Sequence, residues 1–171
     1  MKSIVIYSSL TGNTKKVGEA IASGLPAGTE AVSVKDVPAD LADYDCVFVG
    51  FWVDRGTADK ATADLLPKLR NKHGALFATL GANPKSPHAA ESLDKAAELL
   101  PEGKTPVGKF ICQGAVDPKV IEMMYKMYPK GHAHGQSPER DALHAEAAKH
   151  PDEADLAAAK KFAEETMAKI S

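Results

Sequence analysis

Short apolar runs alternate along the chain with segments whose apolar residues recur at helical spacing. A run of roughly four to eight apolar or β-branched residues is typical of a buried strand, and a recurrence of about 3.6 positions is typical of one helix face. Runs of the first kind predict five strands, at residues 3–7, 30–34, 45–51, 75–80 and 107–113. Strands that alternate with helices indicate an α/β fold, a doubly wound five-stranded parallel sheet with right-handed crossovers.

The helical segments follow the strands and continue beyond the last of them. The first has Val17, Ala20 and Ile21 on its inner face, and Pro67 is expected to kink or end the second, at 58–70. The others are predicted at residues 88–100, 118–128, 138–149 and from about 152 to the end. Because no repeat, linker or change of composition marks a boundary, residues 1–171 are expected to form one domain.

The segment between the first strand and the first helix carries the most specific chemistry. It consists of Ser8-Ser9-Leu10-Thr11-Gly12-Asn13-Thr14, here called the phosphate loop. A turn from the carboxyl end of a strand into a helix points unpaired backbone N–H groups and the positive end of the helix dipole at one spot. Hydroxyl groups add donors there, and Gly12 allows close approach or a positive φ. These features predict a phosphate site, although the same residue types also cap helices that bind nothing.

Two other kinds of phosphate loop do not fit this segment. It has neither the Gly-x-x-x-x-Gly-Lys-Ser/Thr spacing of nucleotide triphosphatases nor a Gly-x-Gly-x-x-Gly pattern. The sequence Ser9-x-Thr11-Gly12-Asn13-Thr14 instead resembles the phosphate loop of flavodoxins, in which hydroxyls and amides enclose the phosphate of FMN without a cation. The resemblance covers residues 1–114 and the last helix. It implies the flavodoxin-like strand order 2-1-3-4-5, with FMN at the switch point between the first and third strands.

That geometry implies three loops that meet in one crevice at the carboxyl edge of the sheet. The phosphate loop would hold the phosphate of FMN, and the loops after the third and fourth strands would flank the flavin ring. The residues expected to bind FMN are Ser9, Leu10, Thr11, Gly12, Asn13, Thr14, Phe51, Trp52, Val53, Asp54, Arg55, Gly56, Leu80, Gly81, Ala82 and Asn83.

Two residues after the third strand have alternative roles. Trp52 can stack on the flavin ring, or it can close the sheet edge over the helix at 58–70. Arg55 beside the ring would favour the anionic reduced flavin and raise the reduction potential, but an exposed arginine can also pair with Asp54 or with solvent. Residues 80–88 lack the tyrosine that covers the outer flavin face in flavodoxins, so one face is expected to be open or covered by another segment.

Residues 115–151, here called the extension, exceed what a short-chain flavodoxin has between its fifth strand and its last helix. Methionines and tyrosines cluster at 123–128, ahead of the sequence His132-Ala133-His134. Such residues usually pack on a sheet, or they can form a lid or an apolar substrate surface. The histidines can donate a proton or bind a metal. Because no framed set of cysteines or carboxylates accompanies them, no metal site is predicted.

Composition narrows the range of functions. A chain of 171 residues can bury a sizeable core unaided. Without an apolar segment of about 20 residues or a signal-peptide pattern, a soluble cytoplasmic protein is expected. A net charge of −2 indicates neither nucleic-acid binding nor a basic membrane surface, and it differs from the strong acidity of general flavodoxin carriers. Cys46 and Cys112 fall in predicted strands and are expected to be inert core thiols.

Three functions are compatible with these features. The first is an FMN-binding electron-transfer protein that passes single electrons to one dedicated redox partner protein, with FMN supplying the chemistry. The second is a flavin-dependent reductase or oxidase that acts directly on a small planar substrate such as a quinone, porphyrin or pigment. The third is a flavin-free interaction module. No conventional catalytic acid, base or nucleophile is implied, and the oligomeric state is not predicted.

Overall fold

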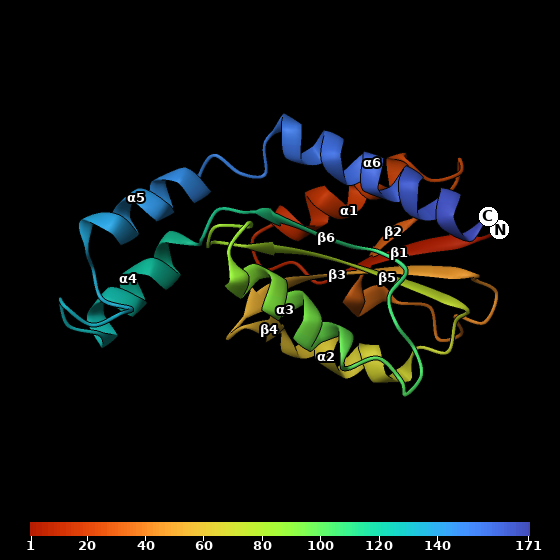
Figure 1. Ribbon diagram of the computed structural model, residues 1–171, viewed down its shortest axis with the longest axis horizontal. Coiled ribbons are helices and arrows are strands. Elements are labelled where there is room, and N and C mark those ends of the chain that lie inside the picture. Colours follow the sequence, from red (N-terminus) through yellow and green to blue (C-terminus); the bar gives the residue numbers. More distant parts are fainter.

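The computed structural model describes residues 1–171 as a parallel sheet between two helical layers, with a helical arm at one end (Figure 1). Hydrogen-bonded neighbours follow the order β2-β1-β3-β5-β6. A two-residue strand, β4, falls between β3 and β5 in the chain, so this is the predicted order 2-1-3-4-5 with the later strands renumbered. The parallel strands are β1 (Ser3–Tyr7), β2 (Ala31–Ser33), β3 (Cys46–Asp54), β5 (His73–Leu80) and β6 (Lys109–Gln113).

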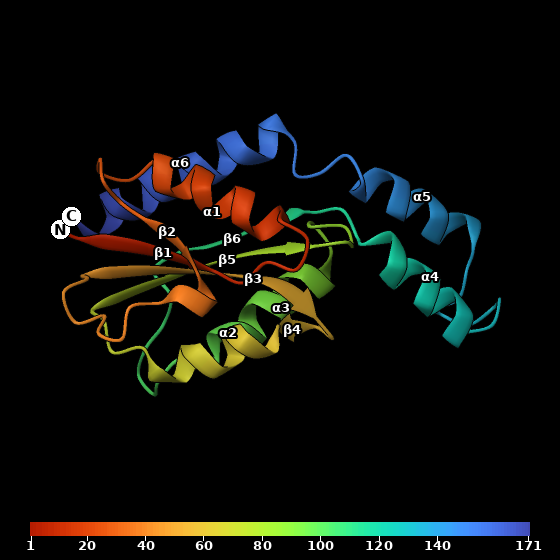
Figure 2. The ribbon, with the colours of Figure 1, turned by 180° about the vertical axis from the view of Figure 1, so that it is seen from behind.

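Helices cover both faces of this sheet (Figures 1 and 2). One face packs against α1 (Asn13–Ser23) and α6 (Glu153–Ile170), and the other against α2 (Lys60–Leu65) and α3 (Pro87–Ala97). A short 3₁₀ helix at Val34–Asp36 follows β2, and another at Leu66–Lys68 continues α2. The second contains Pro67, whose missing N–H ends the α-helical pattern, as predicted.

The core consists of two clusters, one on each face of the sheet. Ile4 and Ile6 of β1 point to the side of α2 and α3, whereas Val5 between them points to the side of α1 and α6. Cys46 and Cys112 lie in the second cluster as free thiols. Burial raises the pKa of each to about 12, so both stay protonated at neutral pH, as expected of inert core thiols.

The segment after the centre of β3 forms a hairpin, so the predicted end of the third strand at residue 51 is wrong. The strand continues through Phe51 and Trp52 to Asp54 and returns as the antiparallel β4 (Thr57–Ala58). The two connecting residues, Arg55 and Gly56, have φ values of 52° and 80°. Two positive φ values define a turn whose twist matches that of the flanking strands, so the β-prone run Phe51–Asp54 stays paired.

The extension projects past the carboxyl edge of the sheet as two further helices, α4 (Pro118–Met127) and α5 (Pro138–Ala147) (Figures 1 and 2). None of the residues of α4 is buried, so the expectation that the methionines and tyrosines pack on the sheet is wrong. The two helices instead contact each other. The Tyr125 hydroxyl donates to Asp141 at 3.1 Å and lies 3.0 Å from Nδ1 of His144.

The helices are also short or polar compared with membrane segments. None of them combines the length and the apolar character that crossing a bilayer requires.

Candidate functional site

The phosphate loop closes on itself at the start of α1. Ser9 Oγ accepts a hydrogen bond from the backbone N–H of Gly12 at 3.0 Å. Gly12 is the N-cap residue and has a φ of 98°, a conformation that disfavours any residue with a Cβ. A Cβ built at Gly12 would meet nothing within 4 Å, so the loop is open on that side.

The N-terminus of α1 differs from those of the other α-helices. Side chains cap the other five helices, with oxygen atoms of Asp59, Ser86, Asp117, Ser137 and Asp152 accepting from a backbone N–H. The cap of α1 is a glycine without a side-chain hydrogen bond. The reading of this loop as a hydroxyl-rich cap therefore does not fit, because the first N–H groups of α1 have no side-chain oxygen as partner.

The side chains of two predicted phosphate ligands form hydrogen bonds with other protein groups. Thr14 is fully buried, and its Oγ1 lies 2.9 Å from Oγ1 of Thr79 at the end of β5. Asn13 Nδ2 donates to the carbonyl of Ala115 at 2.8 Å and to Thr11 Oγ1 at 3.3 Å. Thr14 and Asn13 thus fasten the phosphate loop to β5 and to the extension, while Leu10 remains 59% exposed.

A buried carboxylate beneath the loop was missed by the sequence reasoning. Asp59 is 3% exposed and accepts from Ser8 Oγ at 2.6 Å and from Thr62 Oγ1 at 3.0 Å. It also caps α2. The D-x-x-T spacing of Asp59 and Thr62 is a capping signal that predicts the second contact, but nothing local predicts the contact with Ser8 across 51 residues.

The predicted ring-binding residues of β3 and β5 lie beside the phosphate loop. Trp52 pairs with Thr79 in the parallel register, and the Ser8 N–H donates to the Gly50 carbonyl at 2.9 Å. Side chains alternate along a strand, so Trp52 lies on the same face as Phe48 and opposite α2. The alternative that Trp52 closes the edge over the helix at 58–70 is therefore wrong.

The loop after β5 contacts the start of the extension. The Gly114 N–H donates to the carbonyl of Leu80 at 2.9 Å, and Gln113 Nε2 donates to that of Gly81 at 3.1 Å. A Cβ at Gly81 would lie 2.3 Å from a methyl group of Val116, so a larger residue there would require Val116 to move. Asn83 uses its Oδ1 to accept from the backbone N–H of Lys85 at 2.9 Å, which shapes the turn into α3.

The tip of the β3–β4 hairpin lies beside α3. A Cβ at Gly56 would come 3.7 Å from His88 and 3.9 Å from Lys95. Arg55 is exposed at this tip and makes no ion pair with Asp54. Its effect on a flavin potential stays a prediction.

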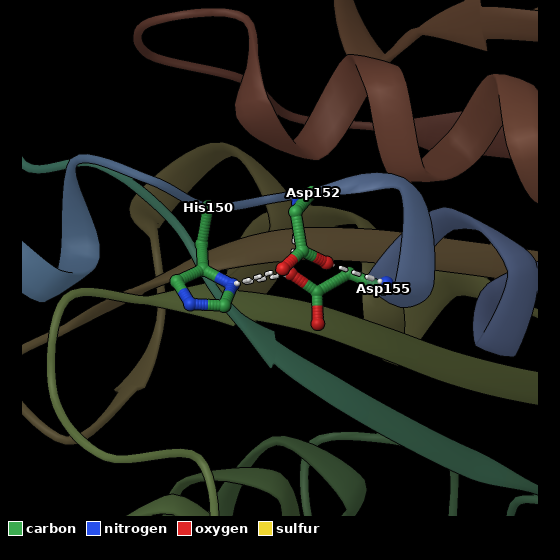
Figure 3. Close-up of side chains that lie close together, drawn as sticks. All are labelled: His150, Asp152 and Asp155. Carbon is green, nitrogen blue, oxygen red and sulfur yellow. Dashed lines mark hydrogen bonds and ion pairs between the residues drawn. The ribbon is translucent and has the colours of Figure 1, made fainter.

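A cluster of one histidine with carboxylates at the base of the extension was also missed (Figure 3). Nδ1 of His150 lies 2.6 Å from Asp155 and 3.7 Å from Asp152, and Nε2 lies 3.2 Å from Glu146. Ionised carboxylates only accept, and the imidazolium form of His150 donates from both ring nitrogens, so that form satisfies both contacts. The hydrogen bond to Asp155 accordingly raises the pKa of His150, and the hydrogen bond from His150 lowers that of Glu146.

The largest hollow described lies at the other edge of the sheet. It encloses about 560 Å³ between residues 37–45 and residues 65–72, next to the amino ends of β3 and β5. Open α/β sheets bind ligands outside the carboxyl ends of their strands, where the phosphate loop lies. The candidate cofactor site is therefore separate from this hollow.

Known proteins resemble the chain over nearly its whole length. The flavodoxin-like domain-containing protein BilS of Clostridioides difficile (strain CD3) is 36% identical over 180 residues, covering 100% of this chain and 99% of that protein. A short-chain flavodoxin associated with a non-canonical PDU bacterial microcompartment has a TM-score of 0.63 at 16% identity, with full coverage of both chains. A flavoprotein of Lactobacillus acidophilus NCFM, solved in complex with FMN, has a TM-score of 0.52 at 18% identity over 64% of this chain and 92% of its own.

Residues 4–164 match the family described as a flavodoxin domain. That match agrees with the parallel strand order and with FMN as the cofactor. The chain belongs to the flavodoxin-domain family.

Proposed function

We propose that this protein is an FMN-binding electron carrier that serves one dedicated redox partner. The observation that carries the proposal is the N-terminus of α1, which has no side-chain cap, beneath a loop in which Ser9 and Thr11 accept hydrogen bonds and keep their own O–H groups as donors, in a flavodoxin-domain chain. Helix N-termini bind phosphate through their free N–H groups and the positive end of the dipole. When bound, FMN supplies the electron chemistry, and the chain supplies its binding and orientation.

The phosphate of FMN is assigned to Ser9, Thr11 and the backbone N–H groups of residues 10–14. The loop contains no lysine or arginine, so the phosphate charge is balanced by N–H dipoles and hydroxyl donors alone. Thr14 and Asn13 act in this assignment by holding the loop against Thr79 and Ala115, which places the N–H groups before FMN arrives.

The ring of FMN is assigned to the region beyond the carboxyl ends of β3 and β5, at the same edge of the sheet. Trp52 lies on the face of the sheet that packs against α1, where its indole can stack on the flavin ring. Phe51 and Leu80 are buried and support the strand ends, whereas Val53, Ala82 and the hairpin residues border the site.

A second candidate is a flavin-dependent oxidoreductase that acts directly on a small planar substrate. The observation that favours it is the direction of the extension, which projects away from the sheet edge and leaves α4 without buried residues. A segment placed in this way does not form a closed lid over the segments after β3 and β5 that are expected to flank the flavin ring. An accessible flavin face is what direct hydride or substrate exchange requires.

Reduction experiments on the purified protein distinguish these candidates. For a carrier, we expect a bound-flavin absorption spectrum, reduction by chemical electron donors in two separate one-electron stages, and slow reduction by NADH or NADPH. Fast reduction by a pyridine nucleotide without a reductase would support the direct oxidoreductase instead. A colourless protein whose Trp52 fluorescence does not change on addition of FMN would contradict both and support the flavin-free module.

A further inference from the structure

Three exposed apolar side chains form a row on one face of α4. Only five large hydrophobic residues of the chain are exposed, and three of them are Val120, Met123 and Met127, with exposed fractions of 37%, 59% and 65%. Their spacing of three and then four positions places them on one side of the helix. We call this row the apolar stripe. Single exposed hydrophobic residues are ordinary, but a contiguous row on a helix without buried residues is typical of an interaction surface.

Hydrogen bonds hold the base of the extension against the phosphate loop. The Ala115 N–H donates to the His150 carbonyl at 2.9 Å, which joins the two ends of the extension to each other. The Ala115 carbonyl accepts from Asn13 at 2.8 Å. A Cβ at Gly114 would lie 3.1 Å from Nδ2 of Asn13, so the two segments are in close contact. Since α4 starts at Pro118, the helix that carries the apolar stripe begins near the carboxyl edge of the sheet and runs outward from it (Figure 2).

Charges beside the stripe indicate the chemistry of what it binds. Helical spacing places Lys119 and Lys126 on one flank of the stripe together with Glu122, which pairs with Lys126 at 3.1 Å, and Lys130 follows the end of α4. A second copy of the chain docked through the same stripe would bring these lysines together, because a two-fold interface pairs a surface with itself. A complementary partner instead offers an apolar groove with acidic residues at its rim, and methionines adapt readily to such grooves.

We propose that the apolar stripe of α4 is the docking surface for the protein that exchanges electrons with the bound FMN, and that this partner presents an apolar groove with an acidic rim. The inference rests on the proposed function for the redox role of the partner. The attachment of the extension supports it, since α4 begins close to Ala115, which accepts a hydrogen bond from Asn13 of the phosphate loop. The lysines beside the stripe then set the orientation of the partner, and Met123 and Met127 supply the buried contact.

The test uses the full chain in the organism that encodes it, with a photo-cross-linking amino acid in place of Met123 or, separately, Met127. The control carries the same amino acid in place of Ala158, an exposed residue on α6. The captured protein is purified and mixed with the reduced wild-type protein, and its reduction is followed by stopped-flow absorption. The same reaction is run with Met123→Glu and with Ala158→Glu, which add one negative charge at exposed positions and leave the core intact.

We expect one protein to be captured from positions 123 and 127 but not from position 158. The rate at which this protein is reduced should fall at least tenfold with Met123→Glu and stay unchanged with Ala158→Glu. With the wild type, the reduction should be slower in high salt than in low salt. Capture of a second copy, absence of capture, a captured protein that accepts no electrons, or co-sedimentation of the purified chain with anionic phospholipid vesicles would each overturn the inference. The flavin spectrum of the purified chain is recorded first, because a chain without FMN defeats the proposed function separately from the capture result.

Discussion

The sheet body and the extension are built in different ways. Residues 1–114 and α6 form two apolar clusters in which Phe48, Phe51 and Phe77 are completely buried. In the extension only Gly135 and Ala147 are buried. Its helices begin at side-chain caps, and polar contacts join them to each other and to α6. The body therefore depends on burial, which dominates folding energy, whereas the extension depends on local signals and hydrogen bonds.

This difference separates the tasks of the two regions. A rigid body can hold a phosphate loop in one geometry before the cofactor arrives, which lowers the entropic cost of binding. A helix pair with little buried area can present its outer face to a partner without disturbing the core.

The largest contrast is expected from truncation of apolar side chains. Phe48→Ala removes a fully buried ring that contacts Phe162 edge-on at 6.0 Å, and it should lower the free energy of unfolding by about 3–5 kcal/mol. Met127→Ala, at an exposed position of α4, should change it by less than about 0.5 kcal/mol. Urea unfolding followed by circular dichroism measures both. Equal losses would show that the extension shares the core of the body.

Replacement of one glycine in each region by alanine should give a smaller difference in the free energy of unfolding. A Cβ at Gly50 would lie 2.0 Å from the ring of Phe77, so Gly50→Ala should cost about 1–3 kcal/mol through overpacking. Gly131 has a φ of 94° but open space around it, so Gly131→Ala carries only a backbone penalty of about 1 kcal/mol. Thermal unfolding of the two variants tests the order. A greater loss at Gly131 would contradict it.

Removal of the Asn13 amide should loosen the extension more than the body. Asn13→Ala leaves the Ala115 carbonyl without this hydrogen bond, a change of about 1 kcal/mol that corresponds to roughly fivefold faster amide exchange. We expect the increase in peptides from residues 115–151 and little change in β3 or β5. Asn83→Ala is the matched control, because it removes the hydrogen bond from the Lys85 N–H in the turn between β5 and α3. Uniformly faster exchange would indicate that the body itself is destabilised.

The smallest effect is expected from pH at the base of the extension. The pKa of His150 is raised above its ordinary value of 6.5 in the folded state, mainly by Asp155. The charged form of His150 therefore stabilises the folded state fully below pH 6.5, and this stabilisation is lost as pH rises through the raised pKa. The pKa of Asp152 is lowered, so its contribution is lost in the opposite direction, as pH falls through that lowered value.

Amide exchange of the extension, measured across this range in the wild type and in His150→Gln, tests the effect. The wild type should lose protection as pH rises past the raised pKa, after correction for the intrinsic rate, and the variant should not. Identical pH profiles in the two proteins would contradict a role for the imidazolium form.

Periodicity was sufficient to predict most of the sheet body. Each of the five parallel strands and each helix of the body has a run or a spacing that burial imposes on the sequence. The β3–β4 hairpin was missed because its turn is Arg55-Gly56, and an arginine with a positive φ is uncommon in such turns. The direction of α4 was also missed, because methionines and tyrosines at helical spacing look the same on a buried face and on an exposed one.

The candidate site was predictable only in part, for a related reason. The phosphate loop is contiguous, so its hydroxyls and glycine are visible in the sequence. The groups that hold it are distant: Asp59 is 51 positions from Ser8, Thr79 is 65 from Thr14, and Ala115 is 102 from Asn13. No local pattern indicates such pairs, and they become evident only once the strand order is known.

The most direct test of the account compares the affinities of the protein for FMN and for riboflavin, which differ by the phosphate alone. Quenching of Trp52 fluorescence measures both. If the phosphate loop holds the cofactor, FMN should bind at least about a hundredfold more tightly than riboflavin, a difference of about 2.7 kcal/mol, and Thr11→Ala should reduce that ratio about tenfold. Equal affinity for the two flavins in the wild type would contradict the account.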